Sequence, residues 1–112
     1  MITGIFGSPV TYEVDELTGN ARLKLKDICS ALDLAWPGQF NKVKADPHGR
    51  YQVFMGTFKA EDGKFYRSIA ISHHFISNFL EDINANKLPP DKAHILDRLR
   101  VKLRDENLLT LL

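Results

Sequence analysis

Nucleophilic chemistry in this chain would need Cys29, a serine or a threonine beside one of its four histidines. Nucleophilic catalysis requires a cysteine, serine or threonine beside a histidine base and an orienting acid, and the spacing of these residues selects no such set. Cys29 falls on the apolar side of a predicted helix, where a buried thiol behaves as a small hydrophobic group. We therefore predict no catalytic residue and assign Cys29 to the core.

Metal and cofactor sites are not predicted either. His73 and His74 are adjacent, so on a helix they point in different directions, and no Cys-x-x-Cys or His-x-x-x-His pair supports them. Acidic pairs such as Glu81-Asp82 are adjacent instead of facing one another across a pocket. The glycine-containing turns do not follow the spacing of a phosphate-binding loop. We expect a protein that is not an enzyme and that needs no metal or cofactor.

Binding of another macromolecule is better supported than catalysis. The stretch from Asp27 to Pro47 is the most informative part of the sequence for this function. Basic and amide side chains collect in and beside it: Lys24, Lys26, Gln39, Asn41, Lys42, Lys44, His48 and Arg50. Such side chains bind phosphates and base edges, so two short helices here would form a helix-turn-helix-like DNA reader. Its nucleic-acid contacts would be Gln39, Lys42, Lys44 and Arg50. An ordinary solvated helix surface explains the pattern equally well.

The last predicted helix offers a second surface. Its cations are spread around the helix, which disfavours a phosphate-binding stripe. Apolar residues outside its inward row, including Val101, Leu108 and Leu112, favour contact with a partner or with a second copy of the chain. A frayed tail explains the same residues equally well.

Composition limits the remaining classes. A chain of 112 residues is the size of one domain, so we expect a single domain over residues 1–112. The net charge of +1 favours a protein partner over a polyanion. The single cysteine, the lack of a signal peptide at the start and the lack of a long apolar run predict a cytoplasmic protein of a bacterial host with no membrane contact.

Hydrophobic periodicity predicts an α+β fold, with a small antiparallel sheet of two hairpins packed against four helices, two short and two longer. Strands are expected over 9–14 and 21–24, and again from 51 to the turn at 61–64 and over 65–71. Short helices are expected from about 25 to 34 and over 37–45. A longer helix capped by Ser72 and a last helix opening at Asp91 complete the prediction. Gln39, Lys42 and Lys44 are expected to be exposed.

Two blocks of residues resemble a known family. The first is Lys26-Asp27-Ile28-Cys29-x-x-Leu32-x-Leu34 followed by Trp36, Gln39, Lys42 and Lys44-x-Asp46-Pro47. The second is Asp62-Gly63-Lys64 and then Ile83-Asn84-x-Asn86-Lys87-Leu88-x-Pro90, leading into a helix with Arg98. Their order and separation resemble the N-terminal domain of phage antirepressors, itself similar to the Bro-N domain.

The resemblance implies a Bro-N-like fold, a phage or prophage origin and a regulatory role. The chain departs from the family at Ile71-Ser72, Phe79 and Leu99-Arg100, and the C-terminal module that usually follows such domains is expected to be absent. Antirepressors bind a phage repressor, whereas Bro-N relatives suggest direct DNA binding. We expect a protein partner and a homo-oligomer, with DNA binding as the alternative. The expected partner contacts are Trp36, Gln39, Lys42, Arg100, Leu108 and Leu112.

Overall fold

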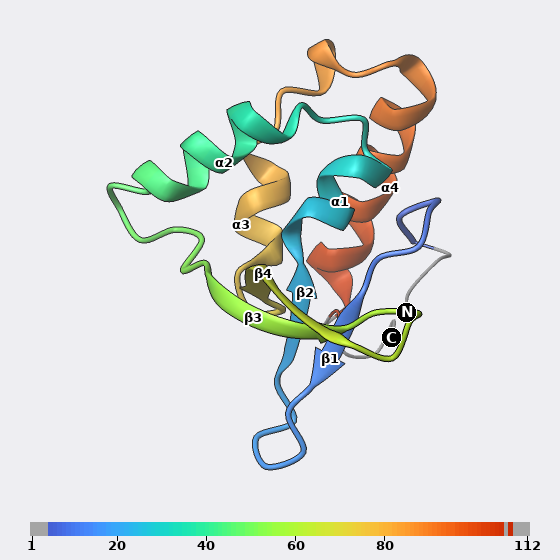
Figure 1. Cartoon of the computed structure of the whole chain (residues 1–112). Helices are drawn as coiled ribbons and strands as arrows, with labels where there is room; N and C mark the ends of the chain where they lie inside the picture. The colour runs from blue at the N-terminus through green and yellow to red at the C-terminus, as the bar shows by residue number, and fades with distance from the viewer. Residues whose placement is uncertain (1–4, 107, 109–112) are drawn as a thin grey trace.

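The computed structural model describes residues 5–106 and 108, and it confirms the predicted α+β fold (Figure 1). The elements in chain order are β1 (Tyr12–Val14), β2 (Ala21–Lys24), α1 (Leu25–Ala31), α2 (Trp36–Ala45), β3 (Phe54–Lys59), β4 (Phe65–Ser72), α3 (Ile76–Glu81), the 3-10 turn η1 (Ala85–Lys87) and α4 (Pro90–Asp105). β1 pairs with β2 and β3 with β4, so both predicted hairpins are present.

The four strands form one antiparallel sheet in the order β1-β2-β4-β3. The sheet curls until the first hairpin reaches the outer strand β3, which crosses in front of it in Figure 1. Arg22 on β2 donates to the carbonyl of Thr57 over 3.2 Å, and the backbone N–H of Lys59 donates to Glu13 on β1 over 3.4 Å. These two contacts satisfy main-chain groups of β3 that would otherwise be open at the sheet edge.

The hydrophobic core lies between the helices and one face of the sheet. Leu23 and Ile71 project from neighbouring strands on this face and are fully buried. Every apolar residue predicted for the inner side of the first helix is buried, as are the two central residues of the last helix: Leu25, Ile28, Cys29, Leu32, Leu96 and Leu99. The periodicity of the sequence therefore located the core correctly.

The opposite face of the sheet holds a second, smaller packed group. Phe58 is only 3% exposed there, and its ring lies within 5.9 Å of the Arg22 guanidinium. Gly56 makes this packing possible, because a Cβ at that position would lie 2.9 Å from the Cβ of Ala70 and 3.2 Å from the Phe58 ring. The packing of Phe58 on this face thus depends on a position without a side chain.

The predicted start of the third helix is wrong. Ser72 does not cap a helix, because it is the last residue of β4 and α3 begins only at Ile76. The backbone N–H of His73 donates to the carbonyl of Ala21 over 2.9 Å, so the antiparallel pairing continues past Ser72 before the chain can turn. As a result α3 has six residues and is the shortest helix, not one of the longer pair.

Candidate partner-binding face

The stretch that the sequence singled out folds as α2 and the loop that follows it. Pro37 lies in the first turn of α2, where its missing N–H costs no hydrogen bond, and Val43 anchors the helix in the core at 2% exposure. After Asp46 the chain loops over residues 47–53 and enters β3. In Figure 1 α2 extends to one side of the fold, and it contacts α1.

Asp46 shapes this loop. Its carboxylate accepts backbone N–H groups of Arg50 (2.8 Å), Tyr51 (3.1 Å) and Gln52 (3.3 Å). Burial acts to raise the pKa of Asp46, but these hydrogen bonds outweigh it and lower the pKa. Because the three N–H groups are used here, the strand predicted from Tyr51 cannot begin until Phe54. Gln52 adopts a left-handed φ of 50°, which completes the turn.

A groove of about 500 Å³ opens between α2, this loop and β4, and we call it the α2 groove. It is lined by Phe40, Val43, Lys44, Asp46, Gly49, Gln52, Val53 and Ile69. Its apolar side chains give it the character of a protein-docking or ligand-docking site. Lys44 is exposed at its border, as predicted, with Nζ 5.7 Å from the centroid of the Phe40 ring.

Lys42 does not have the exposed position expected for a phosphate contact. Its ammonium lies 4.7 Å from the centroid of the Phe79 ring and 5.5 Å from that of Tyr51, which are cation–π distances. Burial lowers the pKa of Lys42, and the nearby Asp82 carboxylate partly offsets that shift. The prediction of an exposed Lys42 is therefore wrong, since the side chain turns inward over the aromatic rings.

Arg50 is also engaged within the chain. Its guanidinium binds the Asp82 carboxylate through two hydrogen bonds of 2.9 and 3.3 Å, and the Tyr51 hydroxyl donates to the same carboxylate over 2.5 Å. The bond from Tyr51, followed by the bonds and charge of Arg50, lowers the pKa of Asp82. Burial and the Asp82 contact raise the pKa of Tyr51 to about 12. Asn78 holds the loop from α3 by donating to the carbonyl of Arg50 over 2.9 Å.

Trp36 and Gln39 lie on the first half of α2 and are both half-buried. The Trp36 ring packs against Phe40 with centroids 5.7 Å apart. Gln39 was expected to be exposed, but its Oε1 is buried and has no hydrogen-bond partner among the described residues. Of the predicted DNA contacts, the structure thus leaves Lys44 exposed and brings Lys42 and Arg50 together around Asp82.

Arg100 and Leu108 serve the fold of the chain itself. The Arg100 guanidinium donates to the carbonyls of Leu80 (2.9 and 3.1 Å), Glu81 (3.3 Å) and Ile83 (2.5 Å), at the C-terminal end of α3. Leu108 is 2% exposed within the core, so its predicted position on a free surface is wrong. Leu112 lies outside the described residues.

The β3–β4 hairpin carries exposed side chains that sequence reasoning missed. Among the described residues, four of the exposed large apolar side chains lie on it: Phe54 (42%), Met55 (49%), Phe65 (65%) and Tyr66 (50%). The signal was present in the sequence, because two adjacent large apolar residues in a strand place one side chain on each face, and only one face can meet the core. We call Met55, Thr57, Lys59, Phe65 and Arg67 the outer hairpin face.

Comparison with known protein families identifies the family of this chain. The family model of the P22_AR N-terminal domain, an N-terminal domain of phage antirepressors, matches residues 7–103. The chain belongs to this family. A search of the curated proteins and a search of the solved structures each gave no significant match. The predicted resemblance to phage antirepressors is confirmed, and membership indicates a phage regulatory role.

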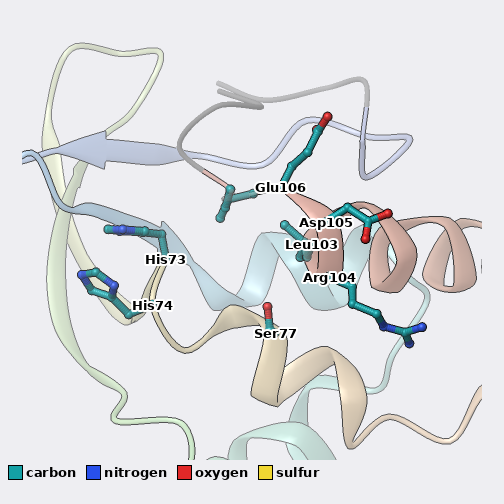
Figure 2. Close-up of a pocket in the computed structure, with 8 residues that line it drawn as sticks. His73, His74, Ser77, Leu103, Arg104, Asp105 and Glu106 are labelled. Carbon is teal, nitrogen blue, oxygen red and sulfur yellow. The ribbon is translucent and has the colours of Figure 1, made fainter.

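The P22_AR N-terminal domain family is generally regulatory and non-catalytic. Figure 2 shows a second pocket, of about 340 Å³, with Ser77 opposite His73 and His74. The His73 ring accepts the backbone N–H of Ala21 through Nδ1 over 3.0 Å, and the His74 ring contacts Asn20 Oδ1 over 3.1 Å. Both rings thus contact the start of β2, at Ala21 and at the preceding Asn20.

Cys29 is equally unsuited to chemistry in this P22_AR N-terminal domain. It is 1% exposed, and burial raises the pKa of its thiol to about 12. Within residues 5–106 and 108, no three His, Cys, Asp or Glu side chains gather as metal ligands would. In the same part of the chain, no helix has the length and apolar composition needed to cross a membrane. The expected protein partner and homo-oligomer stay predictions.

Proposed function

We propose that this chain is a phage or prophage regulatory protein that binds another protein, such as a phage repressor, and thereby modulates or inactivates it. The observation that carries the proposal is the contrast between the α2 groove and the cations beside it. Lys42 and Arg50 are engaged with Phe79, Tyr51 and Asp82, while an apolar groove opens beside them. A surface of this kind fits a protein better than a phosphate backbone.

The overall charge supports the same choice. The net charge of +1 gives no whole-molecule attraction to a polyanion, so DNA binding would need a local excess of cations. Lys44 is the member of the predicted DNA-reading set that is exposed without an ion pair among the described residues. Sequence-specific DNA binding is therefore the weaker candidate.

An operator-release assay tests the proposal. The repressor encoded by the same phage genome is bound to its labelled operator, and the purified chain is added at physiological salt. We expect release of the operator together with a chain–repressor complex in size-exclusion chromatography. Direct, steeply salt-dependent binding of the chain to the operator would support the DNA-binding alternative. If the chain formed no complex and released no operator, the proposal would be wrong.

A further inference from the structure

The outer hairpin face is continuous with the α2 groove. In the β3–β4 pairing Met55 lies opposite Ile69, Thr57 opposite Arg67 and Lys59 opposite Phe65, so these six residues share one side of the hairpin. Ile71, on the same side of β4, points into the core. Ile69, between Arg67 and Ile71 on that side, lines the α2 groove and so connects the groove to the outer hairpin face. The helices cover this side near Ile71 but leave Met55 and Phe65 exposed.

The residue types on this face are those of an interface. Phe65 is 65% exposed and Met55 is 49% exposed, with Arg67 between them on the same side. Aromatic residues, methionine and arginine are enriched in the centres of protein interfaces, where charged residues are otherwise depleted. Large exposed apolar side chains gathered on one element indicate a binding surface.

The charge of the face is one-sided. Lys59 and Arg67 are its charged members, and neither β3 nor β4, both wholly described, contains an aspartate or glutamate. Lys44 adds a third cation at the border of the adjoining groove. Asp46 also lines that groove, but its carboxylate already accepts three backbone N–H groups. The nearby Asp62 is already used, because it accepts the Tyr66 hydroxyl (2.6 Å) and the Lys64 backbone N–H (2.9 Å).

The edge of β3 is less available than its face. The carbonyl of Thr57 and the N–H of Lys59 are bound by Arg22 and Glu13, so an added strand would have to displace both side chains. A second copy of the chain is also a poor occupant, because two such faces would bring Lys59 and Arg67 against like charges. Three cations, Lys59, Arg67 and Lys44, are few for a nucleic-acid backbone.

We propose that the outer hairpin face and the α2 groove together dock a protein segment whose apolar side chains are flanked by carboxylates. This inference rests on the proposed function and names its contact surface and the chemistry of the partner. The apolar side chains of the segment pack between Met55 and Phe65, and its carboxylates pair with Arg67, Lys59 and Lys44.

One test needs no natural partner. The isotope-labelled chain is titrated by NMR with a synthetic peptide of Glu, Leu and Phe, beside a Lys-for-Glu peptide, poly-Glu and a short DNA duplex. We expect the acidic apolar peptide alone to shift amide signals of β3, β4 and the α2 groove, and F65S/R67E to lose the shifts. No shift, a shift elsewhere, or an equal effect of DNA would overturn the inference.

A second test uses the repressor of the same phage. F65S/R67E is expected to bind it at least about tenfold more weakly, as loss of an interface hot spot does. The matched control is L17S/K26E, which likewise replaces a large apolar residue by serine and a cation by glutamate, at exposed positions on the β1–β2 turn and α1. All variants are checked for folding by circular dichroism. If F65S/R67E bound the repressor as tightly as the wild type, the contact surface would lie elsewhere and the inference would be wrong, while the proposed function would stand. Peptide shifts without repressor binding would retain the surface and refute the proposed function.

Discussion

Replacing Arg100 by methionine separates a structural role from a partner contact. Methionine keeps an unbranched apolar stem in the same place but removes the donors that reach the carbonyls of Leu80, Glu81 and Ile83. The carbonyls of Leu80 and Glu81 end α3 and that of Ile83 follows it, and the six residues of α3 leave little internal hydrogen bonding to compensate. We therefore expect R100M to destabilise the whole fold even in the absence of any partner.

The size of the effect follows from the contacts. A hydrogen bond from a charged donor contributes about 1.5–3 kcal/mol, and the bonds of one guanidinium are not additive. The Arg100 side chain is 19% exposed, so water replaces only part of what is lost. We estimate a loss of about 3 kcal/mol from the free energy of unfolding, out of a total of about 5–15 kcal/mol for a domain. With 112 residues, this lowers the Tm by about 10–15 °C.

The assay is urea unfolding followed by circular dichroism, with Tm measured by calorimetry. R98M is the matched control, since Arg98 is exposed on the same helix, and it should change the unfolding free energy by no more than about 0.5 kcal/mol. If R100M were as stable as R98M and instead lost partner binding, the capping role would be refuted and the interface assignment from the sequence restored.

Two further predictions concern groups with shifted pKa values. Burial, and the charge of His74, lower the pKa of His73, so the folded state favours the neutral ring that accepts a backbone N–H. The stability that this group contributes is therefore present above the ordinary histidine pKa. It falls as the pH drops below about 6.5. The midpoints of urea unfolding at pH 7.5 and pH 5 should therefore differ less in H73L than in the wild type. H94N, a control at an exposed histidine, should behave like the wild type, and equal differences in all three proteins would contradict the prediction. Because burial raises the pKa of Cys29 to about 12, a thiol reagent should label it at neutral pH only as fast as the protein unfolds, and rapid labelling of the native chain would show that the thiol is accessible.

The sequence predicted the elements whose evidence is local. β2 was placed at its observed bounds, and α1 buries the apolar residues that its periodicity selected. What it could not predict depends on contacts between distant residues. Lys42 looks exposed on a helical wheel until Phe79 is placed beside it, and Arg50 looks free until Asp82, 32 residues later, binds it. Arg100 likewise acquires its role only when α4 lies against the end of α3.

The residues that carry the family resemblance prove to be mainly architectural. In the first block Asp27 accepts the backbone N–H of Thr11, Cys29 is buried, Lys42 covers two aromatic rings and Asp46 orders the following loop. Such positions are constrained by the fold whatever the protein binds. Choice of partner must then depend on residues that the fold leaves free. The outer hairpin face meets that condition, because its exposed side chains have no packing role that would account for Phe65, Met55 and Arg67 standing together.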